Sequence, residues 1–392
     1  MRSRVKIVIA PDKFKGTLSA TEVAEAMMRG ARRVHPDASF ALRPMADGGE
    51  GTVAALLAAR GGRATTHIVT DPLGSKVHAE IGAMEDGTAC IEMAAASGLQ
   101  LVSTDRRDPL TARSDGTGEL IQVAVDAGVR RIVVGVGGSA TVDGGTGAAR
   151  ARGWRFLDAA GNDLAPGGGA LVGLTRIDPE GTRRLEADIV GACDVDSPLL
   201  GAVGAARRFA RQKGADVAAT DRLEEGLARL AERIREDLDL DVASLPGAGA
   251  GGGMGAGLVA FFGARLEPGF DLVARESSLA AVLEDADLVV TGEGRLDQSS
   301  LRGKVPVGVA RAARAARTTC LAVVGDLVLE RAEWRRAGFE LAVGLVQTGG
   351  IELAKRDPGA AIERATEGLL RHRVETHAGR RVRVRRRPRI LF

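Results

Sequence analysis

Residues 287–304 read Asp-Leu-Val-Val-Thr-Gly-Glu-Gly-Arg-Leu-Asp-Gln-Ser-Ser-Leu-Arg-Gly-Lys, and this segment indicates the fold class. Its apolar run, Leu288 to Val290, predicts a short buried strand. The run breaks at a glycine-rich turn that carries Glu293, and an alanine-rich helical segment follows Lys304. A strand, a charged turn and a helix in this order predict an α/β protein with its chemistry at the carboxyl end of a strand.

The N-terminal segment repeats this pattern. Residues 5–10 are rich in β-branched side chains and predict a core strand, and the loop after it carries Lys13 and Lys15. Ser19 and Glu22 have the spacing of a capping box, which predicts that a helix begins there. Two lysines close to a helix N-terminus favour a phosphate-binding role, because the helix dipole and the free N–H groups attract anions. The alternative is that both are solvated surface lysines.

Carboxylates follow other predicted strands. Asp47 and Glu50 flank two glycines after a strand at residues 39–45, and Asp194 follows an apolar run at 187–193. Such carboxylates suit Mg²⁺, which prefers oxygen ligands, or one of them suits a general base. The alternative is an ordinary polar turn.

A glycine-rich loop at residues 135–147 follows the predicted strand 131–134. Ser139 and Thr141 have hydroxyls that suit phosphate oxygens, and successive backbone N–H groups of such a loop form an anion-binding concavity. Asp143, at the end of the same loop, suits a metal ion or a ligand hydroxyl.

The order of predicted elements suggests two domains. The α/β alternation occupies both ends of the chain, whereas residues 64–92 read as short, hairpin-like strands. We therefore expect a discontinuous doubly wound domain, residues 1–66 and 285–370, with an inserted α/β domain of mixed sheet at residues 67–284. Residues 371–392 are expected to form a basic tail without stable structure.

Composition excludes several classes of protein. With Cys90, Cys193 and Cys320 far apart and no CxxC, neither a zinc site nor a disulfide framework is expected. The scarcity of aromatic residues argues against recognition of nucleic acid by base stacking. Residues 247–264 carry no charge, but eight of them are glycine, which predicts a flexible loop followed by one or two buried helical turns rather than a membrane span. No signal peptide is recognised, so we expect a cytoplasmic protein.

The net charge of +3 conceals an uneven distribution. Residues 371–392 contain nine Arg and one Glu, a formal +8, so the remaining residues sum to −5. The body of the chain is therefore mildly acidic. A basic terminal run can bind nucleic acid, but it is more often a solvated terminus, and we do not expect a nucleic acid partner.

The sequence does not support either of two familiar phosphate-binding motifs, the Walker A loop and the dinucleotide fingerprint. The residues before Gly303-Lys304 lack the first glycine of a Walker A loop, and Val305 stands where Ser or Thr would be needed. A G-x-G-x-x-G pattern at Gly247 does not follow a convincing strand, so nicotinamide chemistry is a weak alternative. The mixture of glycine-rich loops, carboxylates and lysines instead suits phosphoryl transfer, in which Mg²⁺ and cations neutralise the phosphates and a carboxylate accepts the proton of the attacking hydroxyl.

Five blocks of sequence together closely resemble the bacterial type 1 glycerate kinase family, in order from residue 5 to about residue 370. The blocks are residues 9–16, 46–52, 137–145, 193–195 and 291–297. The resemblance implies phosphorylation of glycerate that depends on ATP and Mg²⁺. It also implies a flavodoxin-like α/β domain near both chain ends and a second domain, likened to restriction endonucleases, in the middle.

The chemistry of the side chains suggests individual roles. As catalytic residues we predict Asp47, Asp194, Asp297 and Lys304. As substrate-binding residues we predict Lys13, Lys15, Arg295, Ser139, Thr141 and Asp143, and as metal ligands Glu50 and Glu293. Lysines suit the phosphates, and Arg295 suits the substrate carboxylate because its guanidinium binds carboxylates in a bidentate manner.

The expected partners are glycerate and ATP, with 2-phosphoglycerate as the favoured product, and no membrane. Two alternatives stay open: a kinase for another small hydroxy acid, and a non-catalytic binding protein that uses the basic tail. The sequence also leaves homo-oligomerisation open.

Overall fold

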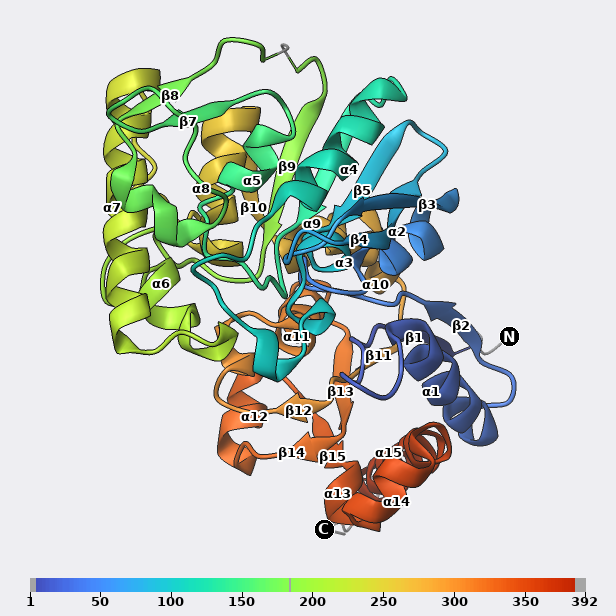
Figure 1. Ribbon diagram of the computed structural model, residues 1–392. Coiled ribbons are helices and arrows are strands. Elements are labelled where there is room, and N and C mark those ends of the chain that lie inside the picture. Colours follow the sequence, from blue (N-terminus) through green and yellow to red (C-terminus); the bar gives the residue numbers. More distant parts are fainter. Residues whose placement is uncertain (1–4, 183–184, 385–392) are drawn as a thin grey trace, which may run out of the picture. The chain divides into compact units, whose positions relative to one another are not determined.

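The computed structural model describes residues 5–182 and 185–384, and the chain divides into two compact units (Figure 1). The first unit joins residues 1–45 to residues 277–392, and the second comprises residues 46–276. The pattern of the sequence predicts domain boundaries after residues 66 and 284, whereas in the structure residues 46–66 belong to the second unit and residues 277–284 to the first.

The helices and strands of the first unit have the following bounds: β1 (Lys6–Ile9), α1 (Ala20–Val34), β2 (Ser39–Leu42), α10 (Leu279–Glu284), β11 (Leu288–Thr291), β12 (Arg295–Leu296), α11 (Val305–Ala315), β13 (Thr319–Val324), β14 (Asp326–Leu327), α12 (Arg331–Ala337), β15 (Leu341–Gly344), α13 (Leu345–Gly349), α14 (Ile351–Arg356) and α15 (Pro358–Val384).

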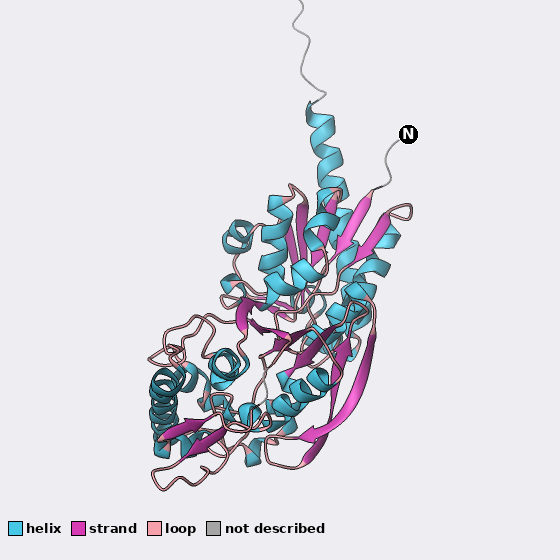
Figure 2. Cartoon of the chain, turned by 90° about the horizontal axis from the view of Figure 1, so that it is seen from above, coloured by secondary structure: helices cyan, strands magenta, loops and turns pink. Residues whose placement is uncertain are grey.

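The main sheet of the first unit has five strands in the order β15-β13-β11-β1-β2, and every pairing is parallel. Successive side chains of a strand point to opposite faces, and both faces of this sheet are covered by helices. Ile7, Ile9 and Val290 pack in one cluster with side chains of α1 and α15. Helix α11 packs against β11, β13, α10 and α12. Figure 2 shows the strands and helices of this unit in separate colours.

Helix α1 begins as the sequence predicts. Ser19 is its N-cap, and the capping box with Glu22 is present in both directions. Glu22 donates its backbone N–H to Ser19 Oγ at 3.3 Å, and the N–H of Ser19 is bonded to Glu22 Oε2 at 2.8 Å. These bonds satisfy two of the N–H groups that a helix start leaves unpaired.

The helices and strands of the second unit have the following bounds: α2 (Thr52–Arg60), β3 (Arg63–Thr70), β4 (Lys76–Ala83), β5 (Thr88–Glu92), α3 (Met93–Ser97), α4 (Asp115–Asp126), β6 (Arg131–Gly135), α5 (Thr146–Arg150), β7 (Arg155–Leu157), β8 (Arg176–Asp178), β9 (Asp188–Cys193), α6 (Ala205–Phe209), α7 (Val217–Leu238), α8 (Ala250–Phe262), β10 (Arg265–Pro268) and α9 (Gly269–Glu276).

The main sheet of the second unit is mixed, as the sequence predicts. Its six strands follow the order β10-β9-β6-β5-β4-β3. Strands β5, β6, β9 and β10 are parallel, whereas β3 and β4 join by antiparallel pairings. The parallel half therefore places the ends of β5, β6 and β9 at one edge of the sheet, and the loops that follow these strands carry predicted site residues.

The segment 247–264 begins with a non-helical stretch and ends in a buried helix, as the sequence predicts. Helix α8 spans Ala250–Phe262, but Gly251, Gly252 and Gly253 have positive, non-helical φ values, so regular helix covers only the part that follows them. The glycines are needed for close packing rather than for flexibility. A Cβ at Gly252 would lie 1.9 Å from the carbonyl oxygen of Thr141, and one at Gly253 would lie 2.8 Å from Gly144 Cα.

Helix α15 extends to Val384, beyond the end near Arg371 that the sequence suggested. It packs against α1, where Arg29 Nε lies 2.9 Å from Glu363 Oε2. The last part of the expected basic tail, residues 385–392, lies outside the described residues. Within the described chain, none of the helices combines the length and the apolar character needed to cross a membrane.

Candidate functional site

In the first unit, the loops that follow β1, β11 and β13 meet at one edge of the sheet. Asp12 donates its backbone N–H to the carbonyl of Gly292 at 2.8 Å. Asp326, after β13, donates its N–H to the carbonyl of Gly294 at 3.0 Å. Parallel strands point their carboxyl ends in the same direction, and hydrogen bonds between the loops fix this edge as a continuous surface.

This edge includes the point at which the strand order reverses. From β1 the chain passes to β2 on one side, and β11 occupies the other side. In open α/β sheets, ligands bind outside the carboxyl ends of the strands at such a reversal. Lys13 and Lys15 follow β1, and the loop after β11 lies beside them: a Cβ at Gly294 would lie 3.5 Å from the backbone nitrogen of Lys15.

The charged side chains of this edge are partly exposed and lie close to one another. Arg295 Nε is 3.6 Å from an oxygen of Asp297 and 3.7 Å from an oxygen of Asp326. Short strands β12 and β14, which pair in parallel, hold Arg295 opposite Asp326. A carboxylate on each side keeps the guanidinium in place while much of it faces solvent.

Asp297 is held as a carboxylate. Its Oδ1 accepts hydrogen bonds from the N–H of Ser299 at 2.8 Å and from the hydroxyl of Ser299 at 2.6 Å. These bonds, helped by the positive charges of Lys304 and Arg295, hold the pKa of Asp297 below its usual value. Lys304 itself precedes α11 as its N-cap, where the helix dipole adds to the positive potential.

Glu293 occupies the turn between Gly292 and Gly294 and is only 6% exposed. Its carbonyl accepts the N–H of Gly325 at 3.0 Å. Thr291, just before it, donates its hydroxyl to the carbonyl of Ala10 at 2.7 Å. The turn therefore places a buried carboxylate at the point where the loops of β1, β11 and β13 converge.

In the second unit, the loop with Asp47 and Glu50 covers the ends of β6 and β9. The carbonyl of Gly48 accepts the N–H of Gly137 at 3.4 Å, and a Cβ at Gly48 would lie 2.6 Å from the carbonyl oxygen of Ala192. Glu92, at the end of β5, accepts the N–H groups of Gly51 and Val53 through one oxygen, at 3.0 and 2.8 Å. Asp47 is half-buried and Glu50 exposed on this loop.

The loop after β6 carries Ser139 and Thr141 and is pinned from several sides. Ala140 donates its N–H to the carbonyl of Ser97 at 2.9 Å, and Gly144 donates to the carbonyl of Gly252 at 3.1 Å. Both Ser139 and Thr141 are buried. The Nζ of Lys213 donates hydrogen bonds to Ser139 Oγ and to the carbonyl of Thr141, each at 2.7 Å.

Asp143 lies inside the second unit, at 0% exposure. Its carboxylate accepts hydrogen bonds from the N–H and hydroxyl of Ser114 at 3.0 and 2.7 Å and from the N–H groups of Gly145 and Gly147 at 3.2 and 3.1 Å. Burial raises the pKa of Asp143, and these hydrogen bonds oppose the rise. The geometry thus favours a role in holding the starts of α4 and α5 rather than direct contact with a ligand.

The predicted residues divide between the units as follows. Lys13, Lys15, Glu293, Arg295, Asp297 and Lys304 belong to the first; Asp47, Glu50, Ser139, Thr141, Asp143 and Asp194 belong to the second. Asp194 is exposed directly after β9. Within each unit, most of these residues follow strands whose carboxyl ends share one edge.

Lys213, Asp326 and Ser299 also contact the predicted residues of these edges, although no sequence motif indicated them. Asp326 follows a predicted strand, and Ser299 is two residues after Asp297. Either position could have indicated that the residue belongs to the edge. Lys213 follows Arg211 and Gln212 in a short polar segment that carries no motif. Its complete burial is visible only in the fold.

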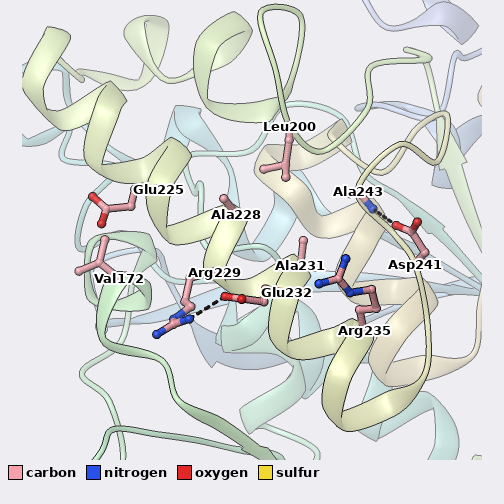
Figure 3. A pocket seen from close by; sticks show the side chains of 10 residues that line it. All are labelled: Val172, Leu200, Glu225, Ala228, Arg229, Ala231, Glu232, Arg235, Asp241 and Ala243. Carbon is pink, nitrogen blue, oxygen red and sulfur yellow. Dashed lines mark hydrogen bonds and ion pairs between the residues drawn. The ribbon is translucent and has the colours of Figure 1, made fainter.

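A separate hollow of about 550 Å³ lies along the surface of α7 (Figure 3). Its walls contain none of the predicted residues and are lined by alanines and by charged side chains that include Glu225, Arg229 and Arg235. Arg229 is engaged with Glu232 at 2.6 Å. We do not identify this hollow with the candidate site, because no glycine-rich loop or strand end converges on it.

Residues 5–182 and 185–384 contain no group of three or more His, Cys, Asp or Glu side chains arranged to hold a metal ion. Magnesium is commonly bound by only one or two carboxylates together with substrate phosphates and water. The carboxylates after β11 and in the loop 46–51 fit this mode in their chemistry, and a metal bound in this way would arrive with its nucleotide.

The chain is similar to known proteins along most of its length. The model of the glycerate kinase family matches residues 7–373. A glycerate 2-kinase from Escherichia coli strain K12 is 49% identical over 369 residues, which cover 93% of this chain and 97% of the relative. A glycerate kinase from Bacillus subtilis strain 168 is 46% identical over 326 residues, 82% of this chain and 85% of that protein.

A solved structure is similar as well. The crystal structure of a protein from Salmonella typhimurium LT2, provisionally named glycerate kinase 2, has a TM-score of 0.84 and 44% sequence identity, and the match covers 97% of this chain and all of that one. The family model matches most of the chain, and the two relatives are 46–49% identical over 82–93% of it. The chain therefore belongs to the glycerate kinase family.

Proposed function

We propose that this enzyme transfers the γ-phosphoryl group of ATP to D-glycerate and that 2-phosphoglycerate is the product. The observation that carries the proposal is the edge of the first unit, where two lysines after β1 lie beside the loop with Glu293, Arg295 and Asp297 at the reversal of strand order. Family membership supplies the acceptor: the relatives at 46–49% identity are named for glycerate.

We propose that the first unit is a flavodoxin-like domain and the second an inserted domain. Numbered along the chain, the five strands of the first unit follow the order 2-1-3-4-5, which is the order of flavodoxin-like sheets. In such sheets a phosphate-bearing ligand binds at the reversal point, and this supports nucleotide binding by the first unit.

Lys13, Lys15 and Lys304 would hold the phosphates in this proposal. Lys15 is exposed, whereas Lys13 and Lys304 are half-buried, and Lys304 lies at the N-terminus of an eleven-residue helix. Ammonium groups bind phosphate oxygens as point charges and need no fixed angle, so side chains from different loops can act together. Their charges would offset the negative charge that accumulates on the transferring group.

The carboxylates would serve the acceptor hydroxyl and the metal. A carboxylate accepts the proton of the attacking hydroxyl in phosphoryl transfer, and Asp297, Asp194 and Asp47 are our candidates. Asp297 is negatively charged at neutral pH, as aspartates ordinarily are, and the hydrogen bonds that lower its pKa stabilise this form further. Glu293 and Glu50 are the proposed ligands of Mg²⁺, which would neutralise nucleotide phosphates when bound. Arg295 is proposed for the glycerate carboxylate.

We further place the enzyme in the cytoplasm. Cys90, Cys193 and Cys320 are all buried free thiols, which suits a compartment that keeps cysteines reduced.

The test is direct. The purified protein is incubated with ATP, Mg²⁺ and D-glycerate, and the phosphoglycerate is identified by NMR. We expect ADP and 2-phosphoglycerate in equal amounts. Formation of 3-phosphoglycerate would correct the position of attack, and no ADP above a control without glycerate would overturn the proposed activity. L-Glycerate and other small hydroxy acids, assayed in parallel, measure the preference for the acceptor.

A further inference from the structure

Lys213 is a buried cation for which the proposed reaction has so far no role. It ends a short 3₁₀ turn, Arg211–Lys213, and its side chain is only 3% exposed. Transfer of an ammonium group from water into a protein interior costs several kcal/mol unless partners compensate. A lysine kept in this place therefore calls for an explanation beyond solubility.

The partners of Lys213 all belong to the glycine-rich loop after β6. Its Nζ lies 2.7 Å from Ser139 Oγ and 2.7 Å from the carbonyl oxygen of Thr141. The carboxylate of Asp143 in the same loop acts on it as the compensating negative charge. The loop is already fixed by backbone hydrogen bonds to Ser97 and Gly252, so Lys213 is not the sole anchor of its path.

The direction of the bond to Ser139 decides what that hydroxyl can do. While Lys213 carries its proton, its ammonium group has three donors and no acceptor, so Ser139 Oγ accepts a hydrogen bond from it. The proton of Ser139 is thereby left to be donated to another acceptor, and donation to its oxygen polarises the hydroxyl. Thr141 supplies a second hydroxyl, which is buried and has no hydrogen-bond partner within the described part of the chain.

Within the described residues, the hydroxyls of Ser139 and Thr141 have no acceptor, and with the buried positive charge beside them they suit a negatively charged oxygen of a ligand. A carboxylate of glycerate and a phosphate of ATP have this chemistry in common. The loop of Asp47 and Glu50 lies against the same loop, since a Cβ at Gly137 would lie 2.8 Å from Gly49 Cα. The oxyanion would thus bind beside carboxylates that the proposed function assigns to catalysis and metal.

We propose that Lys213 is a positioning residue that orients Ser139 as a hydrogen-bond donor to a carboxylate or phosphate oxygen of a substrate. The inference rests on the proposed function for the identity of the substrates. Lys213 does not touch the substrate in this proposal; it acts through Ser139.

The experiment compares four variants: Lys213→Met, Lys213→Arg, Ser139→Ala and the double variant Lys213→Met/Ser139→Ala. Lys355→Met, which removes an exposed lysine of α14, is the matched control. For each variant we would measure kcat, KM for D-glycerate, KM for ATP and the unfolding temperature, alone and with D-glycerate, ATP or inorganic phosphate added.

We expect Lys213→Met and Ser139→Ala each to raise one KM about tenfold, since a hydrogen bond to a charged group contributes at least that factor. The affected substrate identifies the anion: glycerate if it is the carboxylate, ATP if it is a phosphate. The affected KM of the double variant should be no higher than that of Lys213→Met alone, because the two residues act as one unit. Lys213→Arg should restore part of the loss, and Lys355→Met should change nothing.

A purely structural role predicts a different pattern. The unfolding temperature of Lys213→Met would fall while Ser139→Ala kept both wild-type KM values, or the two effects would multiply in the double variant; either result overturns the inference. If the wild type does not turn over glycerate, the proposed function fails separately. The shift of the unfolding temperature on adding ATP or phosphate then tests the inference. A shift that is present in the wild type and lost in Ser139→Ala and Lys213→Met supports it. No shift in the wild type, or a shift retained in both variants, refutes it.

Discussion

The loop after β11 and the loop after β6 handle charge in opposite ways. At the first, Arg295 and Asp297 are partly exposed and, together with Asp326 from the neighbouring loop after β13, form ion pairs in which Arg295 Nε lies 3.6–3.7 Å from the carboxylate oxygens. At the second, Asp143 and the contacting Lys213, from the turn Arg211–Lys213, are buried and form hydrogen bonds with backbone groups and hydroxyls of the protein. Exposed charges can exchange partners when a ligand arrives, whereas buried ones hold a loop in one shape. We therefore expect changes to the packing and to the buried carboxylate Asp143 of the second loop to act mainly on stability, and changes to the exposed charges of the first loop to act mainly on activity.

The largest effect is expected from crowding the loop after β6. Gly252→Ala adds a Cβ that would lie 1.9 Å from the carbonyl oxygen of Thr141, at a residue with φ of 73°. Strain and overpacking together should lower the free energy of unfolding by roughly 2–5 kcal/mol. Gly303→Ala is the control near the other loop: its φ is 104°, but the Cβ meets open space. It should cost only about 1–2 kcal/mol. Urea denaturation measures the unfolding free energy of both variants, and equal losses of stability would mean that the packing around Gly252 can relax.

Asp143→Ala tests the buried carboxylate of the second loop. The substitution leaves the N–H groups of Gly145 and Gly147 and both donors of Ser114 without their acceptor. We expect a loss of about 3 kcal/mol. The matched substitution in the first unit, Asp326→Ala, removes a half-exposed carboxylate and should change stability by less than about 1 kcal/mol. Thermal unfolding measures the stability of both variants, and an Asp143→Ala protein as stable as Asp326→Ala would contradict the expected difference between the two loops.

Asp297→Asn tests the first loop by activity. The change keeps the side chain's shape but removes the charge that we propose to serve the acceptor hydroxyl. We expect kcat/KM to fall about 100-fold, which corresponds to roughly 2.7 kcal/mol, with little change in the unfolding temperature. Asp285→Asn, an exposed aspartate paired with Lys6 in the same unit, is the control and should retain wild-type turnover. Full activity of Asp297→Asn would remove this residue from the proposed chemistry.

The smallest effect is the dependence of stability on pH through Lys213. Burial lowers the pKa of Lys213 from 10.5 to about 7. Between these values the unfolded chain binds a proton that the folded chain has lost, so stability from this group rises with pH above about 7, by at most about 1.4 kcal/mol per pH unit. The unfolding free energy of the wild type minus that of Lys213→Met should therefore increase from pH 7 to pH 8.5. A difference that stays constant would show that Lys213 keeps its proton.

Much of the fold could be predicted from local pattern. The strand at Leu288–Thr291, the capping box of α1 and the long helix α7 follow from apolar periodicity and from side chains that bond their own backbone. The glycine-rich α8 could not be predicted in the same way. Its glycines suggest flexibility by composition, whereas in the structure they are required because Thr141 and Gly144 approach too closely for any side chain.

The candidate site shows the same division. Residues of the first unit such as Lys15, Glu293 and Asp297 stand immediately after predicted strands, and the parallel sheet places those positions on one edge. Asp143 has the same sequence signature, yet its carboxylate turns inward and accepts four hydrogen bonds. A position after a strand indicates where a residue lies, but the direction of its side chain depends on which donors surround it.

The α/β class, the charged strand ends and the resemblance to glycerate kinases can be read from the sequence, because each depends on residues that are close together in the chain. The contacts between loops, the internal position of Asp143 and the burial of Lys213 against Ser139, 74 residues away, appear only once the chain is folded. The physical reason is that burial and hydrogen bonding depend on distance in space. A lysine within a polar segment looks solvated until distant parts of the chain are packed around it.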